Sequence, residues 1–196
     1  MSKRDEILEA ALVKFADKGY CVTLADISEE VGLKVPSLYS HFKSKEQIFY
    51  LVIENEINRY FQYLDHLLIE THGLEETKSR LEMILYGVLK YFENPCKLRF
   101  WKNLPLISQE GLKHYTRQLI HYKEVNHTRR MRILFERGIG RKEIQAGDIN
   151  GYIGLYFAMI QGILDTMLFL NYEEEHLKAF VDSTWKTYWS GIKAKS

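Results

Sequence analysis

Apolar residues recur at spacings of three and four along nearly every long segment of this 196-residue chain. This period places them on one face of an α-helix, whereas a half-buried strand would need strict alternation. Only three prolines interrupt the pattern, and the sequence contains no internal repeat, low-complexity tract or strand-turn-strand signal. The sequence therefore predicts an all-α protein of about nine helices.

The predicted helices fall into a small N-terminal group and a larger C-terminal group. Gly19 and Gly32 follow the first two helices and supply the left-handed residue that commonly ends a helix. Ser44, with Gln47 three residues on, makes a capping box that opens a long fourth helix. We therefore expect residues 1–45 to form a three-helix head and residues 46–196 a larger helical bundle.

Composition narrows the function classes. The formal net charge is +1, so any nucleic-acid binding must come from local positive charge. The two cysteines lie far apart in no metal-ligand or redox spacing, which is typical of free thiols in a reducing cytoplasm. The opening residues have no apolar core of a secretory signal. The most apolar stretch, residues 152–170, carries Gln161 and Asp165 near its middle, so we expect a buried helix and no membrane partner.

The head has the pattern of a helix-turn-helix, two short helices joined by a tight turn at Gly32. Leu38 and Phe42 are four residues apart and should both enter the core of the head. Side chains that could reach a ligand occupy the opposite face: Pro36, Ser37, Tyr39, Ser40 and Lys43. Between residues 32 and 45 every full charge is positive, from Lys34, Lys43 and Lys45. On these features alone the head is either a DNA-reading unit or a small bundle with a solvated lysine cluster.

The residue pattern of the head favours the first alternative. Residues 23–27 read TLADI and residues 32–46 read GLKVPSLYSHFKSKE. This pattern closely resembles the signature of the TetR family of bacterial repressors, including its core of a small hydroxyl residue followed by Leu-Tyr-x-His-Phe-x-x-Lys. The resemblance covers about the first 45 residues, and the remainder resembles the family only in its run of helices and its length. It implies that residues 1–45 are a DNA-binding domain and that residues 46–196 bind a ligand and dimerise.

The resemblance also implies a role for each position in the motif. Tyr39 and His41 would donate hydrogen bonds to DNA phosphates, and Lys45 would add a charge-assisted one. Thr23, at the start of the second helix, would bring a hydroxyl and backbone N–H groups to the other side of the groove. Base edges in the major groove would face a further set of side chains, namely Val35, Pro36, Ser37 and Ser40. Lys34 departs from the family pattern, because Ser or Thr often caps the third helix there.

The predicted DNA-reading side chains include no Arg, Gln or Asn. None of them can make the bidentate contacts that usually distinguish guanine or adenine. The sequence therefore predicts recognition through thymine methyl contacts with Val35 and Pro36, through serine hydroxyls and through DNA shape.

The penultimate helix carries small residues at intervals of three, four and four: Gly151, Gly154, Ala158 and Gly162. Small residues on one face let another helix approach closely, and the last helix adds Leu177 and Val181 as an apolar stripe. Packing within one chain would also explain this pattern. In the TetR family the last two helices form a four-helix dimer interface, so the resemblance favours an isologous homodimer.

The middle helices are rich in aromatic residues, which usually belong to the core. As a group they also suit a concave apolar pocket with a few polar handles. The candidate lining residues are Tyr86, Phe100, Trp101, Tyr115 and Gln161. The family resemblance implies that such a pocket would bind a small hydrophobic or amphipathic effector.

Other chemistry has little support in the sequence. His66 and Glu70 are four residues apart, but seven histidines on amphipathic helices make such pairs frequent by chance. The sequence has no phosphate-binding loop, nucleophile motif or convincing carboxylate pair. We therefore expect no metal, no cofactor and no enzymatic activity.

The combined expectation is a cytoplasmic, ligand-responsive transcriptional regulator, most often a repressor in families of this kind. It would bind palindromic double-stranded operator DNA as a homodimer and be released by a small hydrophobic effector. The alternative is a helical small-molecule-binding or protein-interaction module without sequence-specific DNA binding.

Overall fold

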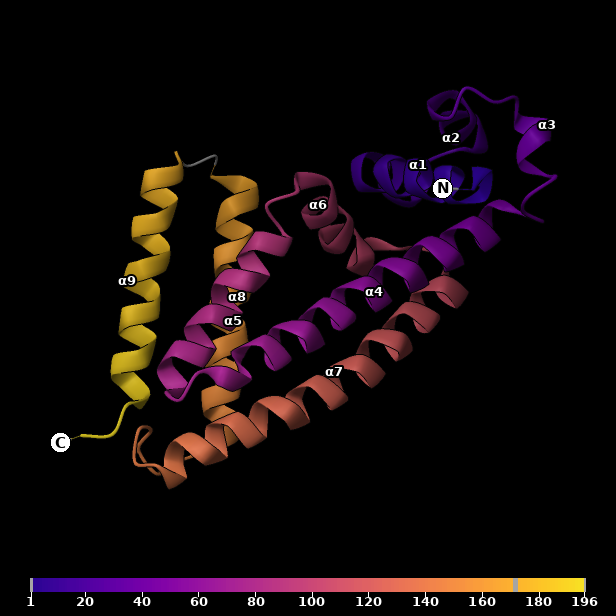
Figure 1. Ribbon diagram of the computed structural model, residues 1–196. Coiled ribbons are helices and arrows are strands. Elements are labelled where there is room, and N and C mark those ends of the chain that lie inside the picture. Colours follow the sequence, from indigo (N-terminus) through magenta and orange to yellow (C-terminus); the bar gives the residue numbers. More distant parts are fainter. Residues whose placement is uncertain (1, 171–172, 196) are drawn as a thin grey trace. The chain divides into compact units, whose positions relative to one another are not determined.

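The computed structural model describes residues 2–170 and 173–195 (Figure 1). Within these two ranges the chain forms nine α-helices and no β-strand, as the sequence predicts. The helices are α1 (Lys3–Lys18), α2 (Leu24–Glu30), α3 (Val35–Leu38), α4 (Lys45–Glu70), α5 (Thr77–Tyr91), α6 (Pro95–Asn103), α7 (Glu110–Gly140), α8 (Ile149–Phe169) and α9 (Glu174–Ile192).

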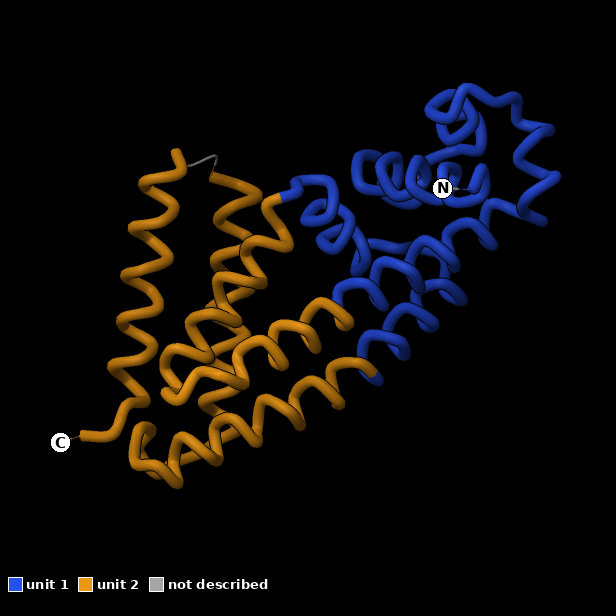
Figure 2. The backbone as a smooth tube through the Cα atoms, in the orientation of Figure 1, with its two compact units in different colours: residues 1–60, 94–122 blue, residues 61–93, 123–196 orange. Residues whose placement is uncertain are grey.

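The chain divides into two compact units (Figure 2). Unit 1 comprises residues 1–60 and 94–122, and unit 2 comprises residues 61–93 and 123–196. The long helices α4 and α7 each contribute residues to both units. Unit 1 thus contains the three helices of the head together with α6. The division of function at residues 45 and 46 stays a prediction.

Unit 1 is organised around α1. The helix begins with a capping box between Ser2 and Asp5, and it ends at Gly19, whose φ of +57° is a conformation that favours glycine. Phe15 is fully buried, and its ring lies 5.2 Å from that of Phe49 on α4 and 5.1 Å from that of Phe100 on α6. These contacts join the head to α4 and α6 in one core.

The C-terminal end of α1 is also fixed by a polar side chain. Asn103, the last residue of α6, donates its amide N–H groups to the backbone oxygens of Phe15 and Ala16 at 3.3 Å and 3.0 Å. These carbonyls lie in the last turn of a helix, where intrahelical partners run out. Arg99 adds an ion pair to Asp17 at 2.9 Å. Two side chains of α6 thus hold the C-terminal end of α1 in place within unit 1.

Unit 2 has a separate core built from α5, α7, α8 and α9. Tyr156 on α8 is fully buried, and its hydroxyl donates to the backbone oxygen of Leu81 on α5 at 2.7 Å. The ring of Phe135 on α7 lies 6.5 Å from the Tyr156 ring. An isolated bridge between Ile144 and Lys193 ties the segment after α7 to the end of α9. Each unit thus has a core of its own that contains buried aromatic side chains.

Two helix boundaries differ from the sequence-based expectation. Three glycines among residues 138–147 predict a loop over this segment, but α7 continues to Gly140. The left-handed residue of the following turn is Lys142, with a φ of +60°. The sequence also predicts a third helix from about Val35 to Lys43, but the α-helix ends at Leu38 and the backbone continues in hydrogen-bonded turns to Phe42.

Helix α8 is long and apolar enough to cross a membrane by length and composition alone, and it is the one such helix among the described residues. Only 28% of its most apolar 18-residue window is buried within the chain. The sequence-based expectation was a buried helix. The structure instead leaves Leu155 61% and Phe169 74% exposed, so α8 presents an apolar surface that the described residues of this chain leave uncovered.

Candidate nucleic-acid interface

Helix α2 and the turn after it hold α3 in place. Thr23 is the N-cap of α2 and forms the predicted capping box with Asp26, whose backbone N–H donates to the Thr23 hydroxyl oxygen at 3.1 Å. Gly32 follows α2 with a φ of +64°. Because this left-handed conformation is costly for other residues, glycine at this position allows the tight turn.

Helix α3 is anchored by two buried side chains, as predicted. Leu38 is 1% exposed and Phe42 is 3% exposed. Pro36 occupies the first turn of α3, where its missing N–H costs nothing. Lys34 is the N-cap and makes no side-chain capping hydrogen bond. The departure from the family pattern at Lys34 therefore leaves α3 without a side-chain cap.

Opposite these anchors lies a solvent-exposed surface that we call the reading face. It consists of Lys34, Pro36, Ser37, Tyr39, Ser40 and Lys43, all exposed. Tyr39 is the largest of them and is 57% exposed. The Ser40 hydroxyl donates to the backbone oxygen of Ser37 at 2.7 Å, which leaves its lone pairs outward. Val35, the remaining predicted base-contacting residue, is half-buried.

Two carboxylates of the head, Asp26 and Glu30, are paired with lysines outside the reading face. Asp26 binds the Lys18 ammonium group and Glu30 pairs with Lys14 at 2.8 Å. The pKa of Asp26 lies well below its usual range, because it accepts hydrogen bonds from the Lys18 ammonium group and from Thr23. Asp26 therefore stays ionised and bound to Lys18 instead of neutralising Lys34 or Lys43.

Two predicted DNA-binding residues have partners within the head. The Lys45 ammonium group donates to the backbone oxygen of Tyr20 at 3.0 Å and lies 4.6 Å from the centre of the Tyr20 ring. The Thr23 hydroxyl donates to the Asp26 carboxylate at 2.7 Å. His41 is half-buried and its ring lies 6.5 Å from that of Phe42. Lys45 and Thr23 thus each have a hydrogen-bond partner within the head, and His41 has an aromatic neighbour there.

Arg4 was not among the predicted site residues. Its guanidinium lies over the Phe42 ring at 5.1 Å, so the start of α1 brings a further exposed cation next to the end of the third-helix region. The adjacent Lys3 and Arg4 were visible in the sequence as a short basic run. Their proximity to Phe42 depends on the packing of α1.

The predicted dimer residues divide between surface and core. Gly154, Ala158 and Gly162 are exposed on α8, and a Cβ placed on Gly154 or Gly162 would have no neighbour within 4 Å. Gly151 and Leu177 are half-buried, whereas Val181 is 3% exposed and packs inside unit 2. The exposed face also carries two large apolar side chains that the prediction omitted, Leu155 and Phe180.

The predicted pocket residues do not form one group. Phe100, Trp101 and Tyr115 belong to unit 1, where Phe100 is fully buried against Phe15, Trp101 packs on Tyr60 and Tyr115 packs on Tyr50. Two others belong to unit 2, namely Tyr86 and Gln161. The Tyr86 hydroxyl donates to Asp182, while burial and this carboxylate raise the pKa of Tyr86. Gln161 is exposed on α8.

The sequence of the head matches the family described as bacterial regulatory proteins, tetR family, over residues 7–51. The match to this family is limited to these residues of the head. Two similar proteins are the HTH-type transcriptional repressor KstR2 of Mycolicibacterium smegmatis, 44% identical over 69 residues, and the IcaR negative transcriptional regulator of Staphylococcus epidermidis, 40% identical over 62 residues. The matches cover 33% and 31% of this chain and 34% of each relative, so they span about a third of the relatives' length.

The likeness to known structures extends beyond the head. The solved structure of the transcriptional regulator FadR from Bacillus subtilis, in complex with stearoyl-CoA, superimposes with a TM-score of 0.74. The superposition covers 97% of this chain and all of the other, at 20% sequence identity. This likeness extends over the body, where the sequence resemblance is weak, and it confirms the all-α fold.

Proposed function

We propose that this chain is a ligand-responsive repressor that binds palindromic operator DNA as a homodimer and leaves it when a small hydrophobic effector binds. The reading face carries the proposal, because it gathers Tyr39, two serines and two lysines on an exposed surface in a family of bacterial regulatory proteins. The KstR2 and IcaR relatives are named as repressors, which supports the sign of regulation.

The chemistry of the reading face suits a DNA groove. Lys34 and Lys43 attract phosphates, and the Tyr39 hydroxyl donates a hydrogen bond to one. Pro36 and Val35 offer apolar contact to thymine methyl groups. Since the face carries no Arg, Gln or Asn for bidentate base contacts and its two lysines are assigned to phosphates, DNA shape supplies the remaining specificity.

A second copy of this chain is the proposed cover of the exposed face of α8 and α9. The groove there is lined by Leu155, Ala158, Phe180 and Thr184 among others. Gly154 and Gly162 leave space for a helix of the partner to approach closely. A two-fold arrangement would bury this apolar surface in both copies and present two reading faces to successive turns of the major groove.

The dimer has a direct test. Leu155→Glu places a charge on the proposed interface, so we expect a monomer by light scattering and an operator affinity reduced by about tenfold or more. Val125→Glu is the matched control, because Val125 is 45% exposed on α7 outside the groove. A Leu155→Glu protein that stays dimeric would contradict this interface.

Release by an effector follows from the conformational equilibrium of the dimer. An effector that prefers a conformer with another separation of the reading faces lowers operator affinity by at most its differential affinity for the two conformers. The FadR structure holds stearoyl-CoA, which supports a small-molecule ligand for this fold. Helix α4 includes residues of both units and is the proposed connection.

The deciding experiment is a gel shift with DNA from upstream of the protein's own gene, beside a scrambled duplex and across a salt series. We expect preferential binding to the upstream DNA near physiological salt. Tyr39→Ala should weaken this binding by about tenfold or more, because it removes the proposed hydrogen bond to a phosphate. Folding should be unaffected, because Tyr39 is 57% exposed. Tyr122→Ala is the control, since Tyr122 is 66% exposed on α7.

The outcomes separate this function from a helical binding module without DNA recognition. Equal, salt-sensitive binding of both duplexes would reflect phosphate attraction alone. If, in addition, Tyr39→Ala changed neither DNA binding nor dimerisation, the module would be the better description.

A further inference from the structure

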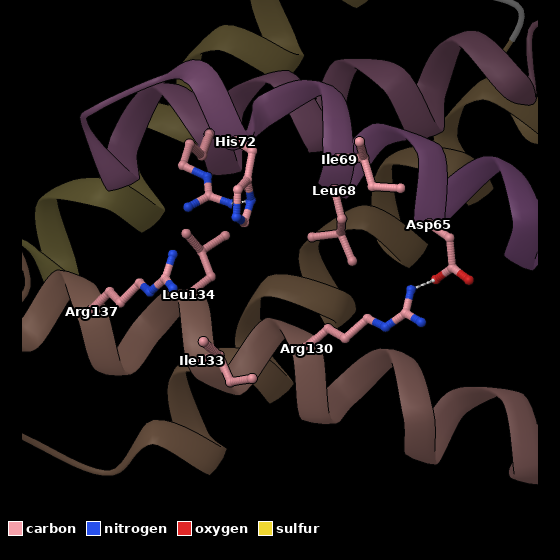
Figure 3. A pocket seen from close by; sticks show the side chains of 9 residues that line it. Asp65, Leu68, Ile69, His72, Arg130, Ile133, Leu134 and Arg137 are labelled. Carbon is pink, nitrogen blue, oxygen red and sulfur yellow. Dashed lines mark hydrogen bonds and ion pairs between the residues drawn. The ribbon is translucent and has the colours of Figure 1, made fainter.

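Unit 2 contains a cleft of about 410 Å³ between the last turns of α4 and the C-terminal part of α7 (Figure 3). Leu68 and Ile69 line it from α4, and Ile133 and Leu134 line it from α7. Ile69 is 69% exposed and Ile133 is 47% exposed, so the cleft opens to solvent. It therefore has an apolar wall on each side.

The charged groups of this cleft are mostly cationic. Arg80, Arg130 and Arg137 line it together with His72 and a single carboxylate, Asp65. Asp65 forms an ion pair with Arg130, drawn as a dashed line in Figure 3. The two other arginines are left without a carboxylate of the cleft.

Arg80 is the most unusual of these groups. It lies in the first turn of α5, is only 8% exposed, and its buried Nε has no hydrogen-bond partner among the described residues. One of its terminal nitrogens lies 3.3 Å from Nδ1 of His72. Burial, and then repulsion from Arg137 and Arg141, lower the pKa of Arg80. A buried guanidinium without a counter-ion is costly unless an anion compensates it.

The neighbouring carboxylate of Glu143 does not supply this anion. It accepts a hydrogen bond from the backbone N–H of Thr77 at 2.6 Å and lies 3.9 Å from Arg141. Among the described residues Arg80 forms no ion pair with a carboxylate, and the positive charges of Arg137 and Arg141 repel its own. The fold thus holds a positively charged, partly desolvated position beside apolar walls.

We infer that this cleft binds the anionic head group of an amphipathic small molecule, with oxyanion oxygens at Arg80 and Arg137 and an apolar tail against Leu68 and Leu134. The planar guanidinium matches a phosphate or carboxylate through two parallel hydrogen bonds. Binding needs no DNA. The further role of this ligand as the effector rests on the proposed function. None of the five pocket residues predicted from the sequence lines this cleft.

Calorimetric titration of the full chain with four probes tests the chemistry: octyl phosphate, octanoate, octanol and inorganic phosphate. We expect one of the two charged amphiphiles to bind at least about tenfold more tightly than octanol and inorganic phosphate. The tighter of the two identifies the head group. If octanol bound as tightly as the charged amphiphiles, the arginines would contribute nothing to binding and the inference would fail. If inorganic phosphate bound as tightly, the apolar walls would contribute nothing, and the inference would also fail.

Arg80→Met tests the residue that carries the inference. We expect at least about tenfold weaker binding of the preferred amphiphile and a ligand-free unfolding temperature equal to or above that of the parent chain, because an uncompensated buried charge is removed. Arg129→Met is the matched control, since Arg129 is exposed on α7 and does not line the cleft. A less stable Arg80→Met protein with unchanged amphiphile affinity would make Arg80 structural and overturn the assignment.

Arg137→Met gives a second test that does not depend on a buried position, because Arg137 is exposed. It should weaken amphiphile binding severalfold without changing stability, and an unchanged affinity would count against the site. Operator binding is then measured with and without the preferred amphiphile. If Arg80-dependent binding leaves operator affinity unchanged, the site stands and its effector role fails.

Discussion

The reading face and the unit 2 cleft hold positive charge in two different ways. The reading face uses Lys34 and Lys43, which are exposed. The cleft uses arginines, and Arg80 is only 8% exposed. Lysine is a strongly hydrated point charge on a flexible stem, whereas arginine offers a planar fork of donors with weaker hydration.

This difference suits two kinds of anion. Exposed lysines gain affinity from a polyanion that releases condensed counterions when it binds, and salt reduces this gain steeply. A buried arginine is screened less and can match one small oxyanion in a fixed geometry. Exposed lysines such as Lys34 and Lys43 thus suit an extended phosphate backbone, and a buried arginine such as Arg80 suits a single head group.

The largest expected effect separates the two units that carry these sites. Phe15→Ala removes a fully buried ring from the core of unit 1 and should destabilise the chain by about 3–5 kcal/mol. Because unit 2 has its own core, DNA binding should fail at lower denaturant concentration than amphiphile binding, and hydrogen exchange should rise first in unit 1. Val13→Ala, at an exposed position of the same helix, is the control. Simultaneous loss of both activities would show that the sites share one folding unit.

Acid should lower the folding stability of unit 2, the unit that carries the cleft. Burial lowers the pKa of His127 to about 4, while Asp65 raises it and Arg130 lowers it by smaller amounts. In the unfolded chain this imidazole titrates near its ordinary value of 6.5, so the unfolded state binds more protons between pH 6.5 and 4. Stability is therefore lost as the pH falls through this window, by about 3 kcal/mol at pH 4.

Urea unfolding at pH 7.5 and pH 4 measures this loss. His127→Phe should show about 3 kcal/mol less loss than the parent chain, whatever other groups titrate in both proteins. His121→Phe, at an exposed position on α7, should lose as much as the parent. Equal losses in all three proteins would mean that His127 is protonated in the folded state.

The next largest expected difference is in salt dependence, because salt should weaken DNA binding at the reading face more than amphiphile binding in the cleft. Two lysines in each of two reading faces give a slope of about −3.6 in log affinity against log salt, or a loss of about 150-fold between 50 and 200 mM. Amphiphile binding in the cleft should fall by less than about fourfold over this range, because it involves one head group. Equally steep salt dependence would remove the distinction drawn between exposed lysine and buried arginine.

The smallest expected effect concerns the start of α3. Lys34→Ser restores a side-chain cap and should stabilise the chain by about 1 kcal/mol. The same change removes a cation from the reading face, so the salt slope of DNA binding should become shallower by about one for each copy in the dimer. Thermal unfolding and the gel-shift salt series measure both effects. Stabilisation with an unchanged salt slope would place Lys34 away from the phosphates.

The architecture of the head could be predicted because its determinants are close in sequence. The capping box of Thr23 with Asp26 spans three residues, and the buried pair Leu38 and Phe42 spans four. Gly19 and Gly32 take the positive φ values that their positions at helix ends predict. Interactions of this range depend on backbone geometry that one short segment defines by itself.

The details of the head already needed tertiary packing. The family resemblance implies a phosphate contact for Lys45, and the structure adds a partner that the motif does not show, because its ammonium group donates to the backbone oxygen of Tyr20, 25 residues away. Arg4 reaches Phe42 only because α1 packs beside the third-helix region. A motif specifies which residues occupy the surface more reliably than which partner each long side chain takes.

In the body, the sequence determined that helices form and that aromatic and small residues recur, and tertiary structure decided where those residues lie. Phe100 lies in the core of unit 1, and Gln161 lies on the surface of unit 2. Val181 is buried, whereas Leu155 is exposed. The sequence around Arg80 does not mark it as buried, yet it is only 8% exposed and its guanidinium lies 3.3 Å from Nδ1 of His72. Helical periodicity defines the apolar faces of a helix, but which face is covered, and by what, depends on contacts between segments far apart in the chain.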